Sequence, residues 1–251
     1  MYQIASDLHI SPYKVIELPI LPSRVIILAG DIAEGLKGLE FAEKIAQEHH
    51  KLVVYVPGNH EYYRHNYIEL QTEMRLFAEQ PENIIFLDND VIELNGTRFI
   101  GSTLWTDYKL DGRYPVARVM EVIEGCLNDH RLIKFGQEER FTTEHALALH
   151  RHAREFLECE LAKNYSGQTV VITHHAPSLK CAHPHFAVDE IAGAFISDMD
   201  DLVKKADLWI FGHTHSNVDI QIGKCRLVSN QLGYSSERLP APYRPDLLID
   251  L

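Results

Sequence analysis

Five short apolar segments each end in residues that commonly bind metal ions, and this repeated pattern restricts the possible folds more than any other feature of the chain. In chain order, the segments are YQIASDLH (2–9), VIILAGD (25–31), LVVYVPGNHE (52–61), TVVITHHAP (169–177) and DLWIFGHTHS (207–216). Continuous apolar runs of this kind are typical of buried strands. The sequence therefore predicts five buried strands that each present polar side chains at the carboxyl end.

Helical patterns separate these strands. Apolar residues recur at helical spacing over 35–48, 66–79 and 142–162, and Thr142 is a candidate N-cap of the last helix. A chain in which strands and helices alternate in this way is expected to form a layered α/β fold.

Two hairpins and two long connections complete the predicted organisation. An Asn-Gly pair suits a type I′ turn within 91–100, and 219–229 resembles a second hairpin. The segments 106–141 and 175–196 are irregular, and we expect them to form loops with short helices that cover the site at the strand ends. No repeat or linker divides the sequence, so we expect a single domain, 1–251.

Charge and cysteine content narrow the class of protein. The formal net charge is −12 and no run of Lys or Arg is present, so a nucleic-acid partner is not expected. No apolar stretch approaches the ~20 residues of a membrane helix, and the first residues lack the pattern of a signal peptide. The four cysteines are scattered, as reduced thiols are, and we expect a cytoplasmic protein. The oligomeric state is left open.

The histidines are unusually numerous, fifteen in 251 residues, and several lie at the predicted strand ends. Ligands of open α/β sheets bind at the carboxyl ends of the strands, so one site could collect these residues. Residues two apart on a strand share a face, which would direct each such pair to one place. Mixed oxygen and imidazole ligands suit manganese, iron or zinc better than calcium. The candidates are Asp7, His9, Asp31, Asn59, His60, His174, His175, His213 and His215.

The same residues form five ordered blocks. They are Asp7-Leu8-His9, Gly30-Asp31, Gly58-Asn59-His60-Glu61, His174 and Gly212-His213-Thr214-His215. Each block alone is weak evidence, but together they resemble the ordered signature of the calcineurin-like metallophosphoesterase superfamily. The resemblance implies a four-layer αββα sandwich, in which two mixed β-sheets flanked by helices hold a dimetal site at the carboxyl ends of the strands.

The resemblance also implies a role for each residue. Four ligands would hold the first metal: Asp7, His9, Asp31 and His215. Asp31 would bridge to the second metal, which would have three further ligands: Asn59, His174 and His213. His60 would bind no metal and would assist the leaving group while a hydroxide that bridges the metals attacks phosphorus. In this scheme His213 and His215 serve different metals.

Departures from known subtypes indicate which activity to expect. Ile32, Ala33 and Glu34 follow the Gly-Asp block, where purple acid phosphatases have a tyrosine ligand and Ser/Thr protein phosphatases have an Asp-Arg-Gly segment. The pattern is most similar to the small bacterial phosphodiesterases. We therefore expect a phosphodiesterase whose substrate is a small-molecule phosphate ester.

Two other classes of function use the same residues. A phosphomonoesterase or a nucleotide pyrophosphatase would differ only in the loops that determine specificity. Some proteins of this fold, such as the retromer subunit, are protein-binding scaffolds that have lost part of the ligand set. Here His60 and all seven ligand candidates are present, which disfavours a scaffold, and a metal-storage protein would not need His60.

Several other residues are candidates for supporting roles. Candidate substrate contacts lie in LNDHRL (127–132), where Arg131 is favoured because a guanidinium binds two phosphate oxygens. We expect His175 and Glu61 to support the site through hydrogen bonds, and we interpret the histidines of the helix over 142–162 as a polar face. For the loop histidines there are two alternative interpretations, contact with the substrate and an ordinary position on the surface. The substrate candidates are Asn128, His130 and Arg131, and the loop histidines are His183 and His185.

Overall fold

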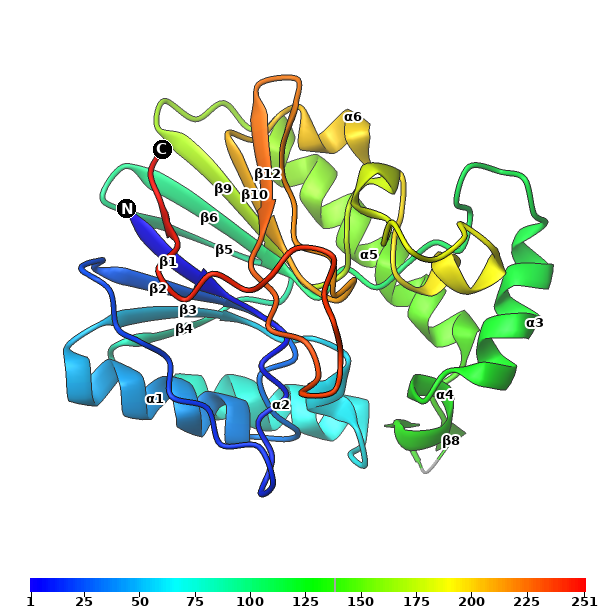
Figure 1. The fold of residues 1–251 in the computed structure, drawn as a ribbon, viewed down its shortest axis with the longest axis horizontal. Coiled ribbons are helices and arrows are strands. Elements are labelled where there is room, and N and C mark those ends of the chain that lie inside the picture. The colour runs from blue at the N-terminus through cyan, green and yellow to red at the C-terminus, as the bar shows by residue number, and fades with distance from the viewer. Residues whose placement is uncertain (138) are drawn as a thin grey trace.

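The computed structural model describes residues 1–137 and 139–251, and two β-sheets face each other at its centre (Figure 1). The first sheet has the order β13-β1-β2-β3-β4; β1 to β4 run parallel, and β13 pairs antiparallel with β1. Its strands are β1 (Tyr2–Ala5), β2 (Val25–Ala29), β3 (Leu52–Val56), β4 (Ile84–Phe86) and β13 (Leu248–Ile249).

The second sheet has the order β11-β12-β10-β9-β6-β5, with four parallel strands and an antiparallel strand at each edge. Both edges are the predicted hairpins, which are therefore confirmed, and φ is positive at Asn95 and Gly96 as a type I′ turn requires. The strands are β5 (Asp90–Leu94), β6 (Thr97–Ser102), β9 (Gln168–Thr173), β10 (Leu208–Phe211), β11 (Asp219–Ile222) and β12 (Cys225–Ser229).

The central strands are buried on both faces, which explains why their sequences are continuously apolar. In β3, Val54 and Val56 pack between the two sheets together with Ile210 of β10. The alternate residues Val53 and Tyr55 pack on the opposite face, in the cluster that contains the apolar side of the first helix. Each strand therefore contributes to two cores.

Helices cover the outer face of each sheet and complete the four predicted layers (Figure 1). The helices α1 (Lys37–His49) and α2 (Tyr67–Ala78) pack on the first sheet, and α5 (Thr143–Ala162) and α6 (Asp200–Val203) pack on the second. The three helices predicted from periodicity are confirmed. None of the helices in the described residues combines the length and hydrophobicity needed to cross a bilayer.

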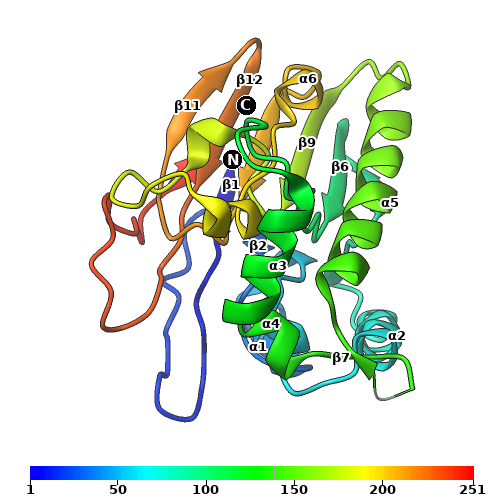
Figure 2. The same ribbon diagram turned by 90° about the vertical axis from the view of Figure 1, so that its right-hand side faces the viewer.

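The two long connections lie side by side beyond one end of the sheets (Figure 2). The first contains α3 (Val116–Cys126), α4 (Asp129–Leu132) and a short hairpin of β7 (Lys134–Phe135) and β8 (Glu139–Arg140). The second contains the 3-10 helices η2 (Leu179–Cys181) and η3 (Glu190–Ala194), and a further one, η1 (His60–Tyr62), follows β3. Both connections line one pocket at the strand ends.

The histidines of α5 do not form the polar face that the sequence suggested. His145 takes part in the N-terminal cap, where Nδ1 accepts a hydrogen bond from the backbone N–H of Thr142 at 3.1 Å. His150 is buried and one of its ring nitrogens lies 3.4 Å from the carbonyl oxygen of Trp105. The interpretation is wrong for His150 because this side of α5 packs against the end of the second sheet.

The N-cap of α5 gives a test of the fold. The side chain of Thr142 accepts a hydrogen bond from the backbone N–H of His145. Thr142→Ala removes this acceptor, so we expect the free energy of unfolding to fall by about 1 kcal/mol in urea titrations. Thr142→Ser keeps the hydroxyl and should retain wild-type stability; equal losses in both variants would contradict the capping role.

Candidate metal centre

The ligand candidates lie on the turns that follow the strands, and five of the seven have left-handed, strained backbone. φ is 54° at Asp7, 46° at His9, 55° at Asp31, 70° at His213 and 48° at His215. Left-handed backbone at a residue other than glycine costs on the order of 1 kcal/mol, and such residues cluster at functional sites. The fold therefore accepts strain in order to place these side chains.

The left-handed backbone shows that the prediction of how these side chains converge is wrong. Alternation along a strand cannot bring Asp7 and His9 together, because β1 ends at Ala5 and both residues have left-handed backbone. The same holds for His213 and His215, since β10 ends at Phe211. Thr214, which lies between these two histidines, also lines the pocket. Turn geometry, rather than strand pleating, directs these side chains.

Gly58 allows the closest approach between two of the turns. A Cβ atom at this position would lie 2.2 Å from Oδ1 of Asp31 and 2.7 Å from Nε2 of His174. Since Gly58 does not have a positive φ, its role is to leave space for these two side chains.

One group of side chains comes from the ends of β1 and β10. The Nε2 atoms of His9 and His215 lie 3.1 Å apart, and Nε2 of His215 lies 3.4 Å from Oδ1 of Asp7. All three side chains are largely or fully buried. Their donor atoms could hold one metal ion.

A second group lies next to the first. Nε2 of His174 is 3.2 Å from Oδ1 of Asp31 and 3.1 Å from the side-chain oxygen of Asn59, and His213 completes this group. The other oxygen of Asp31 lies 3.9 Å from Nε2 of His9 in the first group. Asp31 thus lies between the two groups, and His213 and His215 belong to different ones.

Hydrogen bonds to the rear of the rings fix which nitrogen faces the site. Nδ1 of His174 pairs with the carbonyl oxygen of Ala29 at 2.9 Å, and Nε2 of His213 pairs with that of Ala194 at 3.2 Å. Nδ1 of His215 contacts a carboxylate oxygen of Glu237. Partners of this kind orient histidine ligands and strengthen them.

The charges in the site shift the pKa values of its side chains. Burial alone would lower the pKa of His174, but the carboxylate of Asp31 raises it to about 10. Burial likewise opposes the effect of Asp7 on His215, whose pKa is raised to about 9. Burial would raise the pKa of Asp31, but the imidazole of His174 holds it well below its usual range. Buried carboxylates, an amide oxygen and imidazoles form a donor set that fits two cations.

Comparison with known proteins identifies the family. Residues 4–217 match the family model described as calcineurin-like phosphoesterase. The chain belongs to the calcineurin-like phosphoesterase family. This phosphoesterase is 28% identical over 230 residues to the uncharacterized protein L509 of Acanthamoeba polyphaga mimivirus, a match that covers 85% of this chain and 79% of the relative.

A solved structure has the same fold. The phosphopantetheinyl hydrolase PptH from Mycobacterium tuberculosis superposes on this phosphoesterase with a TM-score of 0.70 at 19% identity, covering 93% of this chain and 89% of that one. The predicted family and the αββα fold are therefore confirmed. The phosphoesterase is a hydrolase of phosphate esters, and its family is characterised by a dinuclear metal site.

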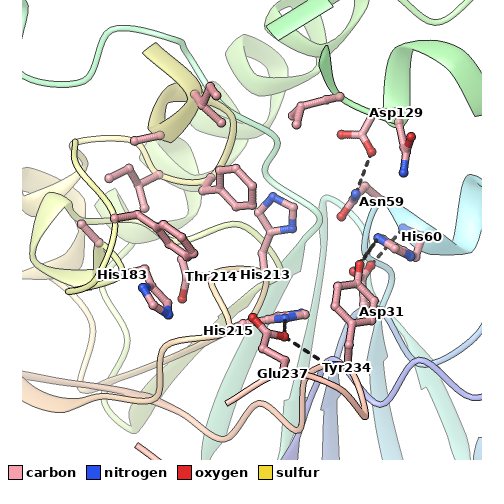
Figure 3. A pocket seen from close by; sticks show the side chains of 18 of the residues that line it. Asp31, Asn59, His60, Asp129, His183, His213, Thr214, His215, Tyr234 and Glu237 are labelled. Atoms are coloured by element: carbon pink, nitrogen blue, oxygen red, sulfur yellow. Dashed lines mark hydrogen bonds and ion pairs between the residues drawn. The ribbon is translucent and has the colours of Figure 1, made fainter. Parts of the chain in front are cut away.

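His60 of the phosphoesterase lies at the edge of the candidate metal centre and lines the pocket (Figure 3). Its Nε2 atom is 3.7 Å from Oδ2 of Asp31 and 3.2 Å from the hydroxyl of Tyr234. The ring of Tyr63 stacks on its ring at a centroid distance of 4.0 Å. Two aromatic side chains thus fix the position of this partly exposed imidazole.

The structure brings only one of the three candidate substrate contacts to the pocket. Asn128 lines it, whereas His130 and Arg131 are not among the lining residues. His130 is buried, and its Nδ1 atom lies 3.0 Å from the carbonyl oxygen of Phe141. Arg131 donates to the carbonyl oxygen of Cys126 at 3.0 Å and to Asn128 at 2.8 Å. The expectation for Arg131 fails because the turn of α4 that directs Asp129 inward directs Arg131 to another face.

Three residues of the site were missed in the sequence. The side chain of Asn59 donates to the carboxylate of Asp129 at 2.8 Å, which directs the amide oxygen of Asn59 toward His174. Tyr234 and Glu237 contact His60 and His215 from the long segment before β13. None of the three follows an apolar strand, so no local pattern marks them.

The supporting histidines have distinct environments. His175 is buried; its Nδ1 atom lies 3.0 Å from the carbonyl oxygen of Thr103, and its ring is 4.2 Å from that of His213. It therefore packs behind the site, as we expected. His183 lines the pocket, whereas His185 is exposed and its backbone N–H donates to Nδ1 of His183 at 3.2 Å.

The buried carboxylate of Glu61 gives a test of how the turns are held. It accepts hydrogen bonds from the backbone N–H groups of Asp31 and Ile32 in the turn after β2 and of Gly58 in the turn after β3. Glu61→Gln turns an amide donor toward these donors, so we expect the free energy of unfolding to fall by about 2 kcal/mol.

The matched control is Glu34→Gln. Glu34 forms an exposed ion pair with Arg64, so its loss should cost less than about 1 kcal/mol. Urea titrations measure both variants, and equal small losses would contradict the role assigned to Glu61.

Metal affinity gives a test of the charge coupling. Because the raised pKa values keep His174 and His215 protonated at about pH 7 without metal, each bound cation must displace a proton. The affinity for Mn²⁺ should therefore fall as the pH is lowered, by about tenfold per pH unit for each proton displaced. Calorimetry in buffers of different ionisation enthalpy counts the protons. Binding without proton release would contradict the coupling.

Proposed function

We propose that the protein is a dimetal-dependent phosphodiesterase that hydrolyses a small-molecule phosphate ester. The observation that carries this proposal is the pair of ligand groups that meet at Asp31. His60 lies beside Asp31 and lines the same pocket (Figure 3). The confirmed family supports the general reaction, and the arrangement of this chain's own residues supports the roles that follow.

Two groups of residues would hold the metals. Asp31 would contribute to both, since its two oxygens face different groups. When bound, two cations supply Lewis acidity and the attacking nucleophile for this class of hydrolysis. The mixed donor set favours manganese, iron or zinc. The first site would comprise Asp7, His9, Asp31 and His215, and the second Asp31, Asn59, His174 and His213.

His60 would place a proton or a hydrogen bond on the leaving oxygen. Its ring also lies close enough to His9 and Asp31 to join them around a cation, but the two ligand groups are complete without it. Its side chain is 20% exposed, which leaves it accessible to a bound ester. The backbone N–H of His60 donates to Oδ1 of Asp31 at 2.9 Å, which ties its position to the bridging carboxylate. Tyr234 would hold the ring in place until an ester oxygen replaces its hydroxyl.

The charge of the pocket favours a diester over a monoester. Among the residues of 1–137 and 139–251 that line it, none is Lys or Arg. Two divalent cations with the carboxylates of Asp7, Asp31 and Glu237, the last of which pairs with His215, would leave a net formal charge of +1, which matches the single negative charge of a diester. For a monoester dianion, the described lining residues provide no Lys or Arg to balance the second negative charge. The phosphomonoesterase alternative is therefore second, and a non-catalytic scaffold is third because the ligand set is intact.

Two remaining proposals concern partners and location. The pocket is of a size that suits a small molecule rather than a polymer, with a cavity of about 530 Å³. The four cysteines are unpaired thiols, which favours the cytoplasm.

The first experiment compares bis-p-nitrophenyl phosphate with p-nitrophenyl phosphate on the Mn²⁺-loaded protein. We expect the diester to react faster. His60→Ala should lower kcat for it by about 10²- to 10⁴-fold without changing the number of bound metals, because only proton transfer to the leaving group is lost.

The matched control is His152→Ala, which removes an exposed histidine of α5 and should leave the rate unchanged. A faster monoester would make the protein a phosphatase. An absence of turnover with two metals bound would favour the scaffold.

A further inference from the structure

One wall of the pocket is apolar, and the proposed chemistry does not use it. The wall is formed by the connection that follows β9, while Asn59, His60 and Asp129 lie on the opposite side (Figure 3). Five large apolar side chains of this connection line the pocket: Phe186, Val188, Ile191, Phe195 and Ile196.

The apolar wall is in direct contact with the candidate metal centre. The ring of Phe195 stacks on that of His213 at a centroid distance of 4.7 Å. The carbonyl oxygen of Ala194 in η3 lies 3.2 Å from Nε2 of His213. A phosphate held at the centre would therefore lie beside this wall.

Part of the wall is exposed without a ligand. Phe186 is 70% exposed and Ile191 is 41% exposed, although both line a pocket. Covering such side chains with an apolar group is favourable because it removes apolar surface from water on both partners. The wall is thus suited to bind an apolar substituent.

The charges around the wall disfavour a second anionic group. The pocket is lined by Asp129, Asp189 and Glu237 in addition to Asp31, and none of its lining residues in the described part of the chain is Lys or Arg. Arg113, whose guanidinium lies 3.4 Å from the carbonyl oxygen of Val188 behind the wall, pairs with Asp111. Beyond the metal centre, a further phosphate or carboxylate would therefore meet carboxylates and no Lys or Arg among the described residues that line the pocket.

We propose that the enzyme selects phosphate esters with an uncharged, apolar or aromatic organic group, and that it rejects esters that carry a second anionic group. The proposal rests on the proposed function, because the metal centre must hold the phosphate. It names Phe186 and Ile191 as specificity residues. It also separates this enzyme from a nucleotide pyrophosphatase, whose substrates carry adjacent phosphates.

The test measures the binding of four phosphonates to the Mn²⁺-loaded protein by calorimetry. Phosphonates have one organic group and are not hydrolysed, so that group alone differs between them. We expect phenylphosphonate to bind about tenfold or more tightly than methylphosphonate, because a hydrophobic pocket discriminates by about this factor. We expect 3-phosphonopropionate to bind about tenfold more weakly than butylphosphonate, which has a similar length and no carboxylate.

Variants of the apolar wall test whether its side chains cause the difference in affinity. The double variant Phe186→Ala, Ile191→Ala changes two exposed side chains and should bring the ratio of phenyl to methyl affinity close to one. Leu76→Ala, at an exposed position of α2 outside the pocket, is the matched control and should keep the wild-type ratio. Ile191→Lys places a cation on the wall and should raise the affinity for 3-phosphonopropionate relative to that for butylphosphonate.

The outcomes separate this inference from the proposed function. Equal affinities for phenyl- and methylphosphonate, or tighter binding of the carboxylated compound, would overturn the inference even if diesters are hydrolysed. An unchanged ratio in the double variant would also overturn it. Discrimination in binding without hydrolysis of any diester would support the apolar wall and remove the phosphodiesterase proposal.

Discussion

The geometry of the candidate metal centre depends on the hydrogen bonds that the buried carboxylate of Glu61 accepts. One of its oxygens accepts backbone N–H groups of Asp31 and Gly58, and the other accepts that of Ile32 and the hydroxyl of Tyr55. It thereby joins the turn after β2 to the turn after β3. These turns carry Asp31, Asn59 and His60, so one buried side chain sets the spacing between the central carboxylate and its neighbours.

The strained backbone and the buried charges of the candidate metal centre reduce the stability of the fold, and apolar packing elsewhere must offset this cost. Several ligand candidates have left-handed backbone, and carboxylates and imidazoles are buried together at the strand ends. Each of these features is unfavourable in isolation. The apolar strands between two helical layers provide the compensating stability, and bound cations would neutralise the buried carboxylates. The protein as a whole is acidic, with a formal charge of −12, so attraction of a phosphate ester would be local to the centre.

The structure gathers the ligand candidates that the sequence named, whereas it brings only part of the expected substrate contacts to the pocket. The ligand candidates follow apolar runs in a fixed order, and this order can be seen in the sequence without knowledge of the tertiary contacts that position their side chains. Arg131 shows the limit of this reasoning: its chemistry suits phosphate, but the turn of α4 directs it away, and Asp129 faces the site instead. Tyr234 and Glu237 reach the pocket from a segment without regular structure.

The sequence by itself determined the α/β layers, the helices, the hairpins and the set of residues at the strand ends, because hydrophobic periodicity and turn chemistry are local properties. Only the tertiary structure decided that left-handed turns, rather than strand alternation, bring Asp7 and His9 together. It also decided that the connection after β9 provides an apolar wall beside His213. Such contacts join residues far apart in the chain, and the path of an irregular segment depends on everything against which it packs.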